Sequence, residues 1–137
     1  MKNVKMSLKL FFIGYLIATI VGFISYYINI NLMWILIFTL MPIIFGYLFY
    51  FYFWKTKCEE SETLKETNRL IVLWITVSFL LDAVVYIIII PIVYGHKSNW
   101  TFFIEQTPWI WLNYMTIILL GHISRFIYLK KLRSINP

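Results

Sequence analysis

Hydrophobic residues in this chain are gathered into four long runs that are separated by short polar segments. A membrane-spanning helix needs about 20 consecutive apolar residues, and each run is long enough. Because every backbone N–H and C=O group needs a partner inside a bilayer, each run is expected to be helical. The alternating pattern of barrel strands does not occur. The expected helices cover residues 10–30, 32–54, 62–94 and 108–131.

The connection between the third and fourth runs is too apolar for a free aqueous loop. It carries a tryptophan, two phenylalanines and an isoleucine within residues 98–106. We expect this segment to lie in the membrane interface, and the alternative is a lid over an outward-facing pocket. Tryptophan is enriched where hydrocarbon meets headgroups. The predicted interfacial anchors are Trp54, Trp100, Trp109 and Trp111.

The overall composition supports a membrane protein and excludes several other classes. Apolar residues make up 61% of the 137 residues, against about 45–50% in soluble domains, and charged residues make up 13%, against about 25%. These values exclude a disordered chain, a collagen-like chain and a disulfide scaffold. The sequence therefore predicts an all-α polytopic membrane protein, with a single four-transmembrane-helix bundle over residues 1–137.

Positive charge is distributed unevenly along the chain, whose net charge is +6. Eleven of the twelve Lys and Arg residues lie near the two termini or in the middle segment 55–69, and only Lys97 lies between the third and fourth runs. The positive-inside rule therefore predicts an N-in/C-in topology, with both termini cytoplasmic. Because the basic residues border apolar runs, the expected partner is the lipid bilayer and not nucleic acid. The expected location is a bacterial cell membrane.

An acidic residue stands at the centre of the third run. Asp82 lies near the expected midplane, where a charged carboxylate costs at least about 2.5 kcal/mol. Ser78 and Tyr86 lie four residues before and after it, so the three share one helical face. We expect this face to point into the bundle, with residues 87–90 covering the lipid side. Asp82 is then either a proton-titrating or cation-binding group, or a structural acid that joins helices.

The fourth run supplies three further polar candidates. Asn113 and Thr116 share a face, and Thr116 falls near the depth of Asp82 when antiparallel helices are counted from their centres. These two residues, or a polar group on the first helix such as Thr19, are the expected partners of Asp82. His122 lies nearer the cytoplasmic end, as a candidate ligand or as a neutral imidazole bonded to a carbonyl. The ligand- or ion-binding candidates are Asp82, Ser78, Tyr86, Asn113, Thr116 and His122.

Small residues recur at every fourth position of the first run. Gly14, Ala18 and Gly22 therefore lie on one face of the expected helix. Such a face lets a second helix approach closely. We expect these residues to pack against the second or fourth helix of the same chain. The alternative is a seam between two copies in a homodimer.

The third helix is expected to begin in water, a turn or two before it enters the membrane. Thr63 and Glu66 have the spacing of a capping box, in which each side chain bonds a free backbone N–H group of the first turn. The charged residues around them indicate a solvated helix end, with ion pairs such as that between Glu66 and Arg69.

The sequence lacks motifs for catalysis and for metal or cofactor binding. Cys58 is the only cysteine, so the chain has no internal thiol pair. Its two histidines are far apart in expected depth and do not supply a three-ligand zinc site or paired haem ligands. No phosphate-binding loop, zinc-protease motif or persuasive Ser–His–Asp set occurs. We therefore expect no catalytic residue, no metal and no cofactor.

The expected function follows from this pattern. A small integral membrane protein without a catalytic set is expected to act through helix–helix contacts, as an accessory, regulatory or immunity-type subunit. Its partner would be another membrane protein or a second copy of itself. The alternative is a small transporter or channel that uses Asp82 with Asn113 and Thr116. A lipid-directed enzyme is the least supported class, because a nucleophile and a base are missing.

Overall fold

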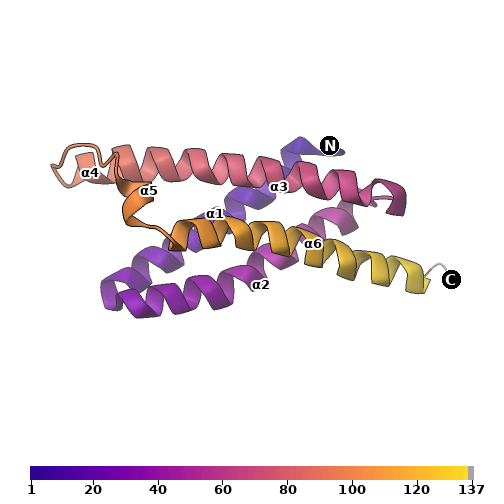
Figure 1. The fold of residues 1–137 in the computed structure, drawn as a ribbon. Coiled ribbons are helices and arrows are strands. Elements are labelled where there is room, and N and C mark those ends of the chain that lie inside the picture. Colours follow the sequence, from indigo (N-terminus) through magenta and orange to yellow (C-terminus); the bar gives the residue numbers. More distant parts are fainter. Residues whose placement is uncertain (136–137) are drawn as a thin grey trace.

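The computed structural model describes residues 1–135, and within that range the chain is helical and contains no strand (Figure 1). Four helical stretches of the described range are long and apolar enough to cross a membrane, which confirms this expectation from the sequence. The elements are α1 (Val4–Ile28), α2 (Ile30–Thr56), α3 (Glu60–Asp82), η1 (Ala83–Ile89), α4 (Ile90–Val93), α5 (Phe102–Glu105) and α6 (Trp109–Ile135).

The four long helical stretches run side by side between two distinct ends (Figure 1). We call one of these the terminal end, since both chain termini and the connection from α2 to α3 lie there. The other is the loop end, which holds the turn at Asn29 and residues 94–108. α1 packs along α2, α2 along α6, and α6 along α3. α1 and α3 meet mainly through long side chains, which are described below.

The first hairpin is made by one asparagine that serves two helices. The backbone N–H of Asn29 donates to the Ser25 carbonyl at 2.8 Å and so closes the end of α1. The Asn29 side chain accepts from the Asn31 backbone N–H at 2.7 Å and so caps the start of α2. Asparagine is favoured at helix N-caps for this reason. A single residue therefore suffices to reverse the chain direction at the loop end.

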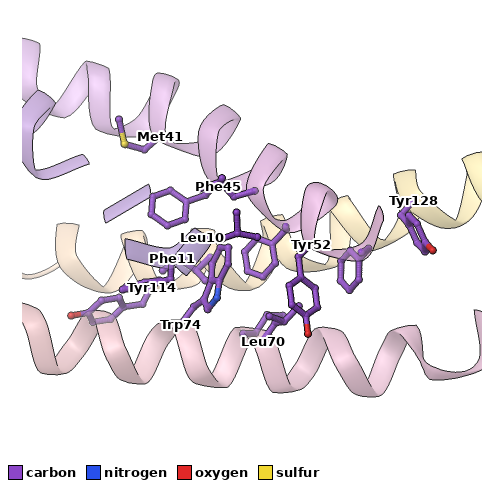
Figure 2. Close-up of a cluster of buried hydrophobic side chains, with 14 of the residues drawn as sticks. Leu10, Phe11, Met41, Phe45, Tyr52, Leu70, Trp74, Tyr114 and Tyr128 are labelled. Atoms are coloured by element: carbon purple, nitrogen blue, oxygen red, sulfur yellow. The ribbon is translucent and has the colours of Figure 1, made fainter. Parts of the chain in front are cut away.

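The core lies between the four helices and is dominated by aromatic rings (Figure 2). Trp74 of α3 is fully buried and lies with its ring centroid 4.0 Å from that of Phe49 on α2. Phe11 of α1 packs edge-on against Trp74 as well. Such rings each bury roughly 150–250 Å² and dominate the energy of packing. They fill the interior between Asp82 and the terminal end.

Close approach of α1 to α2 depends on a glycine. A Cβ atom added at Gly14 would lie 2.8 Å from Leu48 Cδ1 and 3.1 Å from Phe45 Cζ. At Gly22 the nearest side-chain atom, Ile37 Cδ1, is 3.9 Å away, so the helices are looser there. Ala18, between the two glycines, is half-buried. The small-residue face thus packs on α2 of the same chain.

A wide turn changes the helical register beyond Asp82. Residues Ala83–Ile89 form a π-helix, in which backbone bonds run from residue i to i+5. The inward position one turn after Asp82 therefore moves from Tyr86, which is half-buried, to Ile87, which is buried. The expectation that Ile87 covers the lipid side is wrong for this reason. A period of 3.6 residues cannot show such an insertion.

Proline 91 accounts for how the loop is attached to this helix. Pro91 lacks a backbone N–H group, so the Ile87 carbonyl four residues earlier is left free. The Asn99 backbone N–H donates to that carbonyl at 2.9 Å, and the His96 N–H donates to the Pro91 carbonyl at 2.8 Å. The connecting loop is thereby bonded to the end of the helix.

The loop segment expected at the membrane interface folds back on the bundle. Its helix α5 is a single turn. The Phe103 ring stacks on Phe79 with centroids 4.8 Å apart, and the Phe102 ring stacks on Tyr86 at 5.0 Å. Two of its apolar side chains are thus held by the protein itself. The tryptophans predicted as anchors are all exposed: Trp54, Trp100, Trp109 and Trp111.

The start of α3 differs from the expected capping box. The helix already begins at Glu60, and its N-cap Glu59 makes no side-chain cap bond. Thr63 lies inside the first turn, where its hydroxyl donates to the Glu60 carbonyl at 2.9 Å. Glu66 is only 3% exposed and points into the protein. The capping-box prediction is wrong, because Thr63 accepts a hydrogen bond from Arg125 Nε at 3.0 Å and Glu66 is held by groups of α2 and of the N-terminal segment.

Candidate functional site

A row of polar contacts joins α1 to the continuous helical stretch that runs from α3 through η1 to the end of α4. Trp74 Nε1 donates to Ser7 Oγ at 2.9 Å, Tyr15 OH donates to Asp82 Oδ1 at 2.9 Å, and the hydroxyls of Tyr27 and Tyr94 lie 2.7 Å apart. In each pair the two residues are 67 positions apart in the sequence. Equal spacing along two helices requires that they run parallel without slipping. These contacts therefore fix the position of α3 along α1.

Asp82 is the central member of this row and also reaches α6. The side chain is 7% exposed. Its Oδ1 accepts from Tyr15 OH, and its Oδ2 accepts from Tyr114 OH at 2.8 Å. Each carboxyl oxygen is thus bonded to a different helix. Asp82 links α1, α3 and α6 through two hydroxyl groups.

Asp82 has a polar partner on the first helix, as expected, but this partner is Tyr15 and not Thr19, and its partner on α6 is Tyr114 and not Thr116 or Asn113. Thr116 and Thr19 were the expected hydroxyls, but each donates at 2.8 Å to a carbonyl of its own helix, one turn earlier. Threonine often bonds its own helix in this way. The hydroxyl of a tyrosine lies much further from the backbone than that of a threonine, so Tyr15 and Tyr114 bridge the gap between helices. Asn113 makes no side-chain hydrogen bond within the described residues and is half-buried.

Of the other residues on the Asp82 face, Ser78 is buried with it. Tyr86 is half-buried and lies further toward the loop end, where it lines a pocket of about 620 Å³. Loop residues, among them Asn99, form one wall of this pocket. Asp82 is therefore separated from the pocket by one helical turn.

A second buried acid lies at the terminal end. Glu66 Oε1 accepts from Tyr52 OH at 2.5 Å and from the Lys2 backbone N–H at 2.6 Å. The Tyr52 hydroxyl in turn accepts from the Asn3 N–H at 3.2 Å. The start of α1 is thus bound to α2 and α3 together. The sequence pattern around Glu66 is that of a solvated helix start, and the signal for its burial is only the neighbouring Thr63, Thr67 and Leu70 on the same face.

Polar side chains also occur on the outside of α6. His122 is exposed, and neither His122 nor Asn113 makes a side-chain hydrogen bond to any described residue. His122 is therefore not part of the buried group around Asp82. The surrounding surface of α6 is apolar and exposed: Met115, Leu119, Ile123 and Phe126. The structure thus presents an imidazole on an apolar helix face.

Acidic, histidine and cysteine side chains are dispersed over residues 1–135. No group of three or more of them is close enough there to hold a metal ion. What the described site offers instead is a hydroxyl-bound carboxylate inside the bundle, a pocket at one end and a polar residue on an outer face. No family model matches the chain, and comparisons with curated proteins and with solved structures give no match.

Proposed function

We propose that this chain is an integral membrane protein that acts by binding another membrane protein, or a second copy of itself, through the outer face of α6. The role is that of an accessory, regulatory or immunity-type subunit. The observation that carries the proposal is His122, an exposed imidazole inside an apolar membrane-spanning window of α6. Its hydrogen-bonding groups find no acceptor or donor among the described residues.

The energetic argument concerns polar groups in hydrocarbon. Intramembrane ionisable residues face a protein interior or a wet cavity in nearly all cases. A polar group without a hydrogen bond in an apolar medium costs several kcal/mol. A polar residue on a neighbouring helix removes that cost, and interhelical bonds of this type contribute about 0.6 kcal/mol on average. His122 therefore favours a state in which α6 has a helical neighbour from another chain.

The buried carboxylate supports the same interpretation. Asp82 accepts one hydroxyl hydrogen bond on each oxygen and joins three helices, so its place in the chain is accounted for by the cohesion of the bundle. The aromatic side chains packed around Trp74 occupy the interior between Asp82 and the terminal end.

The test is photo-crosslinking from α6 in native membranes. A benzoylphenylalanine placed at Leu119, one turn from His122 and 61% exposed, should give discrete crosslinked species. The control position is Leu16 on α1, which is 60% exposed. Replacement of His122 by Leu should reduce the crosslinked fraction about threefold to tenfold. The isosteric variant Ile123→Leu on the same face should leave that fraction unchanged. Equal crosslinking from Leu119 in the wild-type and His122→Leu chains would refute the proposal.

The orientation of the bundle belongs to the same proposal. The positive-inside rule puts the terminal end in the cytoplasm and the loop end outside. A cysteine at Ser98 should then react with an impermeant maleimide from outside intact cells. A reaction that requires permeabilised cells would reverse the orientation without affecting the α6 interface.

The alternative function is transport or ion binding through Asp82. One observation favours it: Tyr86 lines the loop-end pocket and lies one turn from Asp82. In that case Asp82→Asn keeps the fold and abolishes proton- or cation-coupled flux in liposomes. Under the leading proposal the same variant leaves crosslinking from Leu119 intact. The variant Asp82→Asn therefore distinguishes the two functions when flux in liposomes and crosslinking from Leu119 are both measured.

A further inference from the structure

The pocket at the loop end lies between the end of α1 and the end of α4, where tyrosine side chains from both helix ends come together. Tyr26 of α1 and Tyr94 after α4 line it, and Tyr27 bonds Tyr94 beside it. The pocket volume of about 620 Å³ lies within the range of small-molecule sites. Exposed Trp100 and Trp109 belong to the same end of the bundle. In a membrane this end lies at the level of the lipid headgroups.

The walls of the pocket have two kinds of chemistry. Part of the lining is apolar: the ring of Phe102 stacks on Tyr86, with planes 1° apart, and Pro91 also lines the pocket. The lining also includes side chains that can donate hydrogen bonds: Lys97, His96 and Gln106. An apolar wall beside a group of donors suits an amphiphile with a polar headgroup.

The charge of the pocket favours an anion. Lys97 is exposed, lines the pocket and forms no ion pair with any residue in the described range. The nearest acid in the loop, Glu105, is bound elsewhere: it accepts from Thr101 Oγ1 and, at 3.0 Å, from Asn99 Nδ2. These hydrogen bonds lower the pKa of the Glu105 carboxyl. The Lys97 ammonium is thus left available to a ligand.

We propose that the loop-end pocket binds the phosphate headgroup of a membrane phospholipid, with Lys97 as its cationic contact and the Tyr86–Phe102 wall against its glycerol and upper acyl region. A lysine ammonium is a common point-charge ligand for phosphate. The occupant is a lipid and not free phosphate, because Ile92 and Val93 beside the pocket are exposed and apolar. Acyl chains then remain in the bilayer while the headgroup enters the pocket. This inference does not depend on the interface proposed for α6.

The experiment is native mass spectrometry of the full chain released from nanodiscs. Phosphatidylglycerol is compared with an uncharged galactosyl diacylglycerol that has the same acyl chains. The wild-type chain should retain phosphatidylglycerol in clear excess. Lys97→Gln should reduce that excess about fivefold to tenfold, because a charged contact with phosphate is lost. Lys97→Arg should preserve it, and Lys130→Gln at the terminal end is the matched control that should leave it unchanged.

Three results would overturn this inference. The first is an equal excess of phosphatidylglycerol in wild-type and Lys97→Gln chains. The second is an equal loss in the Lys130→Gln control, which would indicate a general effect of charge. The third is displacement of the lipid by millimolar inorganic phosphate, which would identify a site for a soluble anion. Tryptophan fluorescence of each variant verifies that the chain is folded during the measurement.

Discussion

Removing the Asp82 carboxylate tests whether this residue holds three helices together. In Asp82→Leu the hydroxyls of Tyr15 and Tyr114 both lose their acceptor. Interhelical hydrogen bonds in membranes contribute about 0.6 kcal/mol on average and up to about 1.7. Tyr114 is buried, and a buried hydroxyl without a partner costs about 1–3 kcal/mol. We therefore expect Asp82→Leu to lower the free energy of unfolding by about 2–4 kcal/mol.

The variant Asp82→Asn distinguishes an Asp82 that only joins helices from one that must gain and lose a proton. Asp82→Asn keeps one carbonyl acceptor, and its NH₂ group donates to the second tyrosine oxygen. The expected loss is under about 1 kcal/mol, the value of one ordinary hydrogen bond. Stability is measured as reversible unfolding by SDS in mixed lipid–detergent micelles. A protein in which Asp82 only joins helices should show a small effect for Asn and a large one for Leu.

A double-mutant cycle with Tyr114→Phe makes the test specific. The coupling free energy between Asp82→Leu and Tyr114→Phe should be about 0.6–1.7 kcal/mol, because the two residues share one bond. Thr116→Val is the control, since its hydroxyl bonds its own helix at Leu112. The reasoning is refuted if Asp82→Leu is as stable as wild type. It is also refuted if Asp82 couples to Thr116 as strongly as to Tyr114.

Three further predictions follow from the packing. Gly14→Ala should be less stable than Gly22→Ala by about 1–2 kcal/mol in the SDS assay. A Cβ at Gly14 would lie 2.8 Å from Leu48 Cδ1 and 3.1 Å from Phe45 Cζ, whereas the nearest side-chain atom at Gly22 is 3.9 Å away. Equal stabilities of the two variants would contradict the geometry. Glu66→Ala should destabilise by about 1–3 kcal/mol in that assay, since the buried carboxylate accepts two hydrogen bonds; a neutral effect would contradict its role. Burial raises the pKa of the Cys58 thiol, so maleimide labelling near neutral pH should be much slower in the folded chain than in SDS. The labelling rate of the folded chain should increase with pH as the thiolate forms. Equal rates in the folded chain and in SDS would show an accessible thiol.

The four long apolar helices could be predicted from the sequence because their signal is long and local. Some 20 apolar residues in a row leave few alternatives to a buried or membrane helix. The ends of the helices were less predictable. α1 begins at Val4, well before residue 10, because Asn3 accepts from the Met6 N–H and so caps a turn that carries lysines. Hydropathy does not register a polar first turn.

The surroundings of Asp82 depended on information that hydropathy does not contain. Its position in the third run indicates an inward face, but its partner on α1, Tyr15, is set by the offset of 67 residues between α1 and α3. That offset follows from the lengths of two helices and two connections together. The π-helix after Asp82 also moves Ile87 inward. Only Pro91 in the sequence indicates a disturbance there.

Glu66 shows why the local sequence is a poor guide to whether a charged residue is buried or exposed. An acid among other charged residues at a helix start usually lies in water, and only the uncharged residues on the same face, Thr63, Thr67 and Leu70, indicate otherwise. Its burial depends on Tyr52 and on the backbone of Lys2, which are remote in sequence. A buried carboxylate that accepts hydrogen bonds from remote groups is a tertiary feature. Such features are visible only when the helices are assembled.

The central claim is that the outer face of α6 is covered by another chain in the native membrane. Oxygen collision with a nitroxide spin label at Leu119 measures this directly, with a label at Leu16 as the equally exposed reference. The account predicts that oxygen reaches the Leu119 label much less than the Leu16 label, and that His122→Leu restores access. Equal oxygen access at the two positions in native membranes would show that α6 faces lipid and would contradict the account.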